Sequence, residues 1–264
     1  MRRRVTPRPG LEQLVRVSLQ TEQAARMARL KPEITTSLGQ TLLLFKPEES
    51  AQADFTMGAS RREPGRRSNE VLHPVALRRM FYLSTTEVTN AQFRQFQADH
   101  DSGFVRGNSL NKQQQPAVKL SWQQAASFCN WLSAREGLAP FYTEDRGIIV
   151  GFNPAATGYR LPTEAEWVYA ARVAGRSDVA RYPWGDGYPP TTAAGNFADA
   201  QIADTLANVV TGYNDGYRAS APVGSFSAQP GGFNDMGGNV SEWINDFYAV
   251  YPGQAARLVK DPMG

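Results

Sequence analysis

The sequence predicts a fold of short strands and three helices, followed by a long region with little regular secondary structure. Short apolar segments separated by turns run from Thr41 to Leu83, and three helix starts with capping residues follow them. Beyond Gly175 the hydrophobic periodicity nearly disappears. The chain has 264 residues, of which 41% are hydrophobic, and this suffices for one large core or two modest ones.

Residues 1–40 differ in composition from the rest of the chain, because they are rich in Arg, Gln, Thr and Pro and contain no aromatic residue. We interpret them as a linker or as the tail of a preceding domain. Within them, Val15, Val17 and Leu19 alternate as a strand does, and Gln20–Leu30 is compatible with a short helix. Residues 41–264 then form one globular domain.

The sequence of the first part of this domain predicts strands. Thr41–Phe45 is expected to be a strand, and Phe55–Gly58 is a second short apolar segment. Arg61–Asn69 is expected to be a charged loop, since it contains both proline and glycine. Val71–Leu83 is interpreted as a strand pair or as one bent strand.

Three helices are predicted from their N-terminal caps. Thr89 or Asn90 caps the first, and Ser121 and Thr163 cap the second and third. In the last two, Gln or Glu follows three residues after the cap, which is the pattern of a capping box. The expected inward-facing residues are Phe93 and Phe96 on the first helix, Ala125, Phe128, Cys129 and Leu132 on the second, and Trp167, Ala170 and Ala171 on the third, with Gly137 and Gly175 ending the second and third helices.

The region after Gly175 contains turn-dense, aromatic strings: YPWGDG, GNFAD, TGYNDGY and APVGSF. It is too aromatic for a disordered segment, and structureless stretches of this length inside a domain usually carry function or need support. We therefore expect folded loops that bound cations hold in place. The aromatic residues Tyr182, Trp184, Tyr213 and Tyr217 form either part of a strand-poor core or a surface for a protein partner.

Gly231–Asp246, which reads GGFNDMGGNVSEWIND, combines glycines with three carboxylates. Glycine permits the left-handed backbone of a tight loop, and Ca²⁺ takes six to eight oxygen ligands from carboxylates and carbonyls. The loop is therefore a candidate calcium site. The alternative is a structural turn whose Asp and Asn side chains cap their own backbone. No spacing here matches an EF-hand loop, so composition leaves both interpretations open.

Composition also excludes several classes of site. The net charge of +3 is nearly balanced, which argues against a nucleic-acid-binding surface. The single cysteine, Cys129, excludes an intramolecular disulfide and a CxxC site, and we expect it to pack in the core. Two histidines are too few for a multi-histidine metal site. No apolar run is long enough to span a membrane, and no signal peptide is visible.

Six strings in a fixed order resemble the formylglycine-generating enzymes, also called sulfatase-modifying factors. They are TTEVTNAQFRQF, PAVKLSWQQAASFCNWLS, GYRLPTEAEWVYAAR, YPWGD, APVGSF and GGNVSEW, and the resemblance covers about Leu42 to Gly264. It implies an irregular α+β fold related to C-type lectins, loop-rich and low in regular secondary structure, with calcium bound in its loops.

The resemblance also implies two sets of calcium ligands. One set uses an Asn side chain, the carbonyl after it, an Asp side chain and a carbonyl two residues further on. The other uses a side chain before the GNxxEW string, two loop carbonyls and the Glu of that string. Carried onto this sequence, the ligands are Asn196, Phe197, Asp215 and Tyr217 for the first set, and Asp235, Gly238, Val240 and Glu242 for the second.

The sequence departs from the family pattern in its cysteines. Members that oxidise a sulfatase cysteine bind copper through two cysteines downstream of GNxxEW, and Cys129 matches neither of them. We expect the domain to be incomplete at its C-terminus, with copper bound only if a further segment supplies the pair. Relatives that synthesise ergothioneine-type sulfoxides bind iron through several histidines, which this chain lacks.

The leading expectation is a calcium-stabilised, non-catalytic domain that acts in binding or assembly. Its partner would be a protein, a peptide or the remaining part of a longer polypeptide. The alternative is the N-terminal portion of a copper-dependent oxidase that forms formylglycine. The sequence does not decide the cellular compartment: calcium favours an extracytoplasmic setting, yet no export signal is visible.

Overall fold

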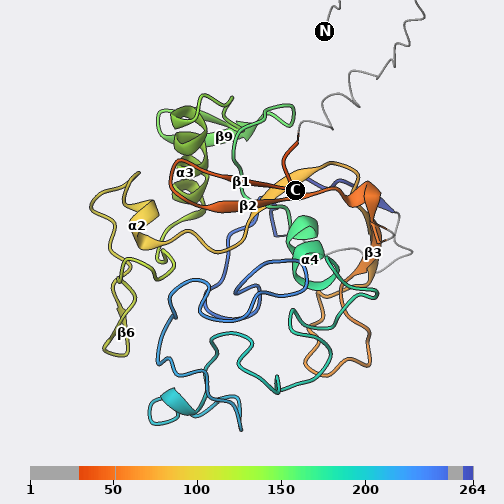
Figure 1. The fold of residues 1–264 in the computed structure, drawn as a ribbon, viewed down its shortest axis with the longest axis vertical. Coiled ribbons are helices and arrows are strands. Elements are labelled where there is room, and N and C mark those ends of the chain that lie inside the picture. The colour runs from red at the N-terminus through yellow and green to blue at the C-terminus, as the bar shows by residue number, and fades with distance from the viewer. Residues whose placement is uncertain (1–29, 51, 249–257, 264) are drawn as a thin grey trace, which may run out of the picture. The chain divides into compact units, whose positions relative to one another are not determined.

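The computed structural model describes residues 30–50, 52–248 and 258–263 (Figure 1). The strand and helix predicted within residues 15–29 lie outside this range. The elements, in chain order, are β1 (Glu33–Thr35), β2 (Thr41–Phe45), η1 (Pro47–Glu49), β3 (Asp54–Met57), β4 (His73–Ala76), β5 (Phe81–Ser84), α2 (Asn90–Phe93), β6 (Phe104–Val105), β7 (Asn108–Ser109), α3 (Trp122–Arg135), β8 (Tyr142–Asp145), β9 (Ile148–Phe152), α4 (Glu164–Arg172), η2 (Ala200–Ile202) and β10 (Val259–Lys260).

One three-stranded antiparallel sheet has the order β1-β2-β5. Strand β2 has the predicted bounds, and it pairs with β1 in a register that sets Ile34 opposite Leu42. Strand β1 lies in the stretch that the sequence assigned to a linker, and the compact unit begins at Glu33 instead of Thr41. Three residues are too few for alternation to reveal a strand. The following turn is held by a hydrogen bond from the Ser37 amide to Glu136 Oε1 at 2.6 Å.

A second sheet has the order β10-β4-β3, with β10 parallel to β4. The predicted strand pair in Val71–Leu83 is therefore two strands in two different sheets. The chain leaves β4 at a turn that Asp261 holds, because its Oδ1 accepts hydrogen bonds from the amides of Arg78 and Arg79 at 2.6 and 3.0 Å. A residue near the C-terminal end thus fixes where β4 stops, and local sequence does not reveal this contact.

All three predicted helix caps are present, with Thr89, Ser121 and Thr163 at the N-cap positions. In each helix the cap hydroxyl accepts from the backbone three residues on, and the side chain there accepts from the cap amide. Two details differ from the expectation. Helix α3 buries Ala126 in place of Ala125, which is half-buried, and α2 ends at Phe93, so Phe96 lies beyond it.

The main core lies between α4, strands β2 to β5 and the loop that contains Phe233 and Met236. The Phe45 ring contacts three others: it stacks on Phe81 at 5.2 Å and on Phe233 at 5.1 Å, and meets Tyr169 edge-on at 5.7 Å. Since Phe233 is fully buried, it anchors the glycine-rich loop to the sheet.

Two hairpins complete the regular structure, β6-β7 and β8-β9. Each turns over two residues with positive φ: Arg106 and Gly107 in the first, Arg146 and Gly147 in the second. Such turns match the right-handed twist of the strands. Neither hairpin was predicted from the sequence.

After α4 the described chain contains only η2 and β10 as regular elements, as the lost periodicity predicted. In Figure 1 this part runs as teal and blue loops beside α4. Within the described residues, no helix is both long and apolar enough to cross a membrane.

Candidate cation-binding loops

The first predicted ligand set is brought together around the carboxylate of Asp215. Asp215 Oδ2 accepts from the Phe197 amide at 2.7 Å, and Oδ1 accepts from the Tyr217 amide at 2.8 Å and from Asn196 Nδ2 at 3.2 Å. Burial, followed by the charge of Asp199, raises the pKa of Asp215. The four residues of this set therefore form one cluster.

Neighbouring contacts hold that cluster in place. Asp199 is fully buried, and its Oδ2 accepts from the Asp215 amide at 2.5 Å while its Oδ1 accepts from the Gln201 amide at 2.8 Å. A carboxylate offers about four lone-pair positions, and three donors already occupy those of Asp215. The first loop is thus largely satisfied by its own hydrogen bonds, with room at the carboxylate for one further ligand.

The second set centres on Asp235, which is 3% exposed and has a left-handed backbone with φ 58°. Its Oδ2 accepts from the Gly224 amide at 2.7 Å. Its Oδ1 is buried and receives no hydrogen bond from the described part of the chain. A buried, unpaired carboxylate oxygen is energetically costly, so it indicates a proton or a cation at this position.

Glu87 contributes a further carboxylate that the sequence analysis did not include. Its Oε1 accepts from Asn239 Nδ2 at 3.0 Å, whereas its Oε2 is buried and unpaired among the described residues. Burial first, and then the charge of Asp235, raises the pKa of Glu87 to about 8. Burial raises the pKa of Asp235, and a hydrogen bond that protonated Glu87 donates to it acts in the opposite direction, so the two carboxyl groups lie within reach of each other. When both carboxyl groups are deprotonated, Glu87 Oε2 and Asp235 Oδ1 have no hydrogen-bond donor among the described residues.

Of the other members of the second set, Glu242 interacts with this pair. Glu242 is exposed overall, but its Oε2 accepts from the indole of Trp167. Desolvation and the charge of Asp235 raise the pKa of Glu242 to about 7. Within the described part of the chain, no hydrogen bond joins Gly238 or Val240 to either carboxylate, and both residues are half-buried.

No three His, Cys, Asp or Glu side chains of the described chain are gathered closely enough to hold a metal by themselves. A cation here would take carbonyl oxygens, amide oxygens and water in addition to carboxylates. Ca²⁺ accepts this mixture, whereas Zn²⁺ prefers nitrogen and sulfur ligands. The donor set therefore fits calcium best at the loop of Asp235, where two buried oxygens are unpaired, and less completely at the loop of Asp215.

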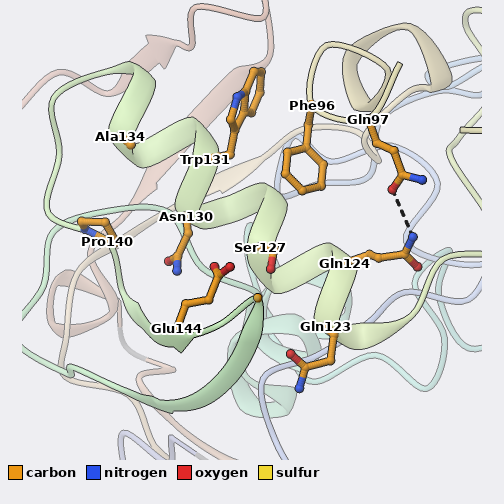
Figure 2. A pocket seen from close by; sticks show the side chains of 11 residues that line it. Phe96, Gln97, Gln123, Gln124, Ser127, Asn130, Trp131, Ala134, Pro140 and Glu144 are labelled. Atoms are coloured by element: carbon orange, nitrogen blue, oxygen red, sulfur yellow. Dashed lines mark hydrogen bonds between the residues drawn. The ribbon is translucent and has the colours of Figure 1, made fainter. Parts of the chain in front are cut away.

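A concavity of about 610 Å³ lies along α3 (Figure 2). Its amide side chains are committed to the fold. Asn130 exchanges two hydrogen bonds with the backbone of Tyr142, at 2.9 and 3.1 Å, and Gln123 Oε1 accepts from the Ile149 amide at 2.7 Å. Gln124 belongs to the capping box and also donates to Gln97 at 3.1 Å. The contacts of Asn130 and Gln123 attach the β8-β9 hairpin to the helix, and that of Gln124 attaches the segment after α2, so we assign them a structural role.

Cys129 is buried in the core beside Ala126 and Phe141, as the sequence predicted. Burial raises its pKa to about 12. A thiolate is the form that binds metal or attacks a substrate, and at neutral pH this thiol stays protonated.

Of the predicted aromatic loop residues, Tyr182, Trp184 and Tyr213 lie in one cluster of rings, and Tyr217 contacts Phe226 instead. Trp184 stacks on Tyr182 at 4.9 Å and meets Phe197 edge-on at 5.3 Å, and Phe197 in turn contacts the buried ring of Tyr213. Their contacts support a packing role more than a partner surface.

A family model described as the sulfatase-modifying factor enzyme 1-like domain matches residues 51–261. The chain belongs to this family. Among the relatives of this chain, the chaperone protein LppX of Paenibacillus barcinonensis is 29% identical over 195 residues, which are 64% of this chain and 63% of LppX. The formylglycine-generating enzyme of Thermomonospora curvata is 33% identical over 145 residues, which are 54% of this chain and 38% of that enzyme. The chain therefore spans less than two thirds of each of these relatives.

The solved structure of Treponema denticola variable protein 1 has the same fold, with a TM-score of 0.66 at 21% identity over 87% of this chain and 82% of that one. This likeness confirms the irregular, loop-rich α+β fold class of C-type-lectin type that the sulfatase-modifying factor resemblance predicted.

Proposed function

We propose that this chain is a calcium-stabilised domain of the sulfatase-modifying factor family that acts by binding and does not itself carry out thiol-based oxidation. The observation that carries the proposal is the pair of buried, unpaired oxygens on Glu87 and Asp235. Two carboxylates in contact repel each other unless a proton or a cation lies between them. A divalent cation that displaces this proton would supply the positive charge between the two carboxylates.

The chain's own residues define what such a cation would meet. Asp235 and Glu87 would hold it through their unpaired oxygens, with Glu242 and the carbonyls of Gly238 and Val240 as the remaining predicted ligands. At the other loop, Asn196, Asp215 and the carbonyls of Phe197 and Tyr217 would hold a second cation. A cation would supply positive charge where these carboxylates meet.

Calcium affinity is expected to rise with pH. Ligands have to be deprotonated to bind, and burial and neighbouring charge raise the pKa of Glu87 to about 8. Below that pKa, each fall of one pH unit should therefore weaken calcium binding by up to about tenfold, because binding releases one proton. Titration with calcium between about pH 6 and about pH 9 checks this linkage, and an affinity independent of pH across that range contradicts it.

In the metal-free chain, the stability of the fold changes with pH in the opposite direction to the calcium affinity. A carboxyl whose pKa is raised on folding binds a proton more tightly in the folded state, so the metal-free fold loses stability as pH rises from the unfolded pKa towards about 8. The two dependences distinguish a cation at Glu87 from a general effect of pH on the protein.

The burial and raised pKa of Cys129, the one cysteine of the sequence, favour binding over catalysis. A copper(I) oxidase of the kind that makes formylglycine holds its metal through thiolates. Cys129 is buried on a helix, and burial raises its pKa to about 12, so it is unsuited to that task. The exposed aromatic side chains of Trp243, Phe247 and Tyr248 offer apolar surface for a protein partner. A role in assembly also agrees with the description of LppX as a chaperone.

The second candidate function is a copper-dependent, formylglycine-forming oxidase of which this chain is one part. The similarity to the Thermomonospora curvata enzyme supports it. It requires that the encoding reading frame continue into a segment with paired cysteines. Reading the frame beyond Gly264 discriminates between the two functions.

We expect the 264-residue chain to form no formylglycine when incubated with copper, oxygen and a cysteine-containing sulfatase peptide. Mass spectrometry of the peptide measures this directly. The matched control is Cys129→Ser, which should behave like the unmodified chain. Formylglycine made by the unmodified chain and lost in Cys129→Ser would contradict the non-catalytic half of the proposal.

A further inference from the structure

The two candidate cation-binding loops touch through their main chains. The Asn196 carbonyl accepts a hydrogen bond from the Asn239 amide at 2.8 Å. A Cβ atom built on Gly195 would lie 2.1 Å from the Gly237 oxygen, and one built on Gly238 would lie 2.4 Å from the Asn196 oxygen. No side chain fits between the loops at these points, so neither backbone can shift there without moving the other.

Two of these three contacts involve a residue of a predicted ligand set. Asn196 supplies its side chain to the first set, and Gly238 supplies its carbonyl to the second. Asn239, which donates its amide to Asn196, also donates Nδ2 to Glu87 and accepts from the Ala221 amide at 2.9 Å. Asn239 has a left-handed backbone with φ 56°, a conformation that surrounding contacts have to maintain.

We propose that the two cation sites are coupled, so that filling one raises the affinity of the other. This inference rests on the calcium-binding part of the proposed function. A cation at Glu87 and Asp235 fixes the position of Asn239, and the Asn239 amide fixes the Asn196 carbonyl. The first site then loses less conformational freedom when it binds its own cation. Coupling of this kind is reciprocal in binding free energy.

Single-site variants measure the coupling. Asp215→Asn removes the charge at the first site, and Asp235→Asn removes it at the second, with nearly unchanged shape. Calcium titration of the metal-free chain by calorimetry gives the dissociation constant of each site in the unmodified protein and of the remaining site in each variant. We expect the remaining site to be weakened by about fivefold or more, and by the same factor in both variants.

A second pair of variants tests the contact itself. Gly195→Ala adds the Cβ that would collide with the Gly237 oxygen, and it should reduce the coupling factor. Gly187→Ala is the control, because a Cβ there meets no atom within 4 Å. It should bind both cations as the unmodified chain does. If Gly195→Ala does not fold, the two aspartate variants still decide the question.

The possible results separate the coupling from the proposed function. Two sites whose dissociation constants are unchanged in both aspartate variants would overturn the coupling and leave calcium binding in place. Absence of any calcium binding by the unmodified chain would overturn the proposed function, and the coupling with it. Unequal factors in the two variants would also contradict a reciprocal linkage.

Discussion

Replacing Phe233 by alanine is expected to lower the free energy of unfolding by about 3 to 5 kcal/mol, the usual cost of truncating a buried phenylalanine. Phe233 is fully buried and stacks on Phe45 at 5.1 Å, within the core cluster formed with α4. Because the ring fills space between the sheet and the glycine-rich loop, its removal leaves a cavity that the surrounding strands cannot close.

Denaturant unfolding of Phe233→Ala against the unmodified chain measures this effect. Phe247→Ala is the matched control, since Phe247 is 84% exposed and its removal should change stability by less than about 0.5 kcal/mol. A loss in Phe233→Ala as small as in the control would mean that the loop is not anchored to the core through this ring.

Removing calcium is expected to lower the melting temperature by about 5 to 10 °C. A ligand that binds only the folded state at about 100 times its dissociation constant adds about 2.7 kcal/mol, and a chain of this size shifts by about 2 to 4 °C per kcal/mol. Thermal melts with calcium and with a chelator measure the difference. The response should shrink in Asp235→Asn, Asp215→Ala and Glu242→Ala.

The control for this experiment is a carboxylate outside both loops. Asp204 is exposed and pairs with Arg218 at 2.8 Å, so Asp204→Asn should keep the full response to chelator. Comparing responses to the chelator, and not absolute melting temperatures, separates loss of the cation from loss of hydrogen bonds such as those that Asp215 accepts. A melting temperature that the chelator leaves unchanged in the unmodified chain would remove calcium from the account.

Local features of this fold could be predicted from the sequence. Thr89, Ser121 and Thr163 were identified as caps because a capping box depends on residues three positions apart. Strand β2 was predictable because it is a short, mostly apolar run of five residues. The end of β4 was not predictable, because Asp261 fixes it from the opposite end of the chain.

The candidate site could likewise be predicted only where its residues are close together in the sequence. The residues around Asp215 could be grouped from the sequence, because the resemblance aligned them within two short strings. Glu87 was missed, because it follows β5 and reaches Asp235 only through the fold. The backbone contact between Asn196 and Asn239 was likewise invisible, since nothing in either string indicates its neighbour in space.

Calcium titration of the metal-free chain and of Glu87→Gln tests the central claim most directly. In the variant the amide can donate the hydrogen bond that Asp235 Oδ1 lacks, so the site no longer needs a cation. We expect calorimetry to show calcium binding by the unmodified chain and an affinity at least about tenfold weaker in Glu87→Gln, as the loss of one charged ligand implies. Equal affinities in the two proteins, or no binding by the unmodified chain, would contradict a cation at the buried carboxylates of Glu87 and Asp235.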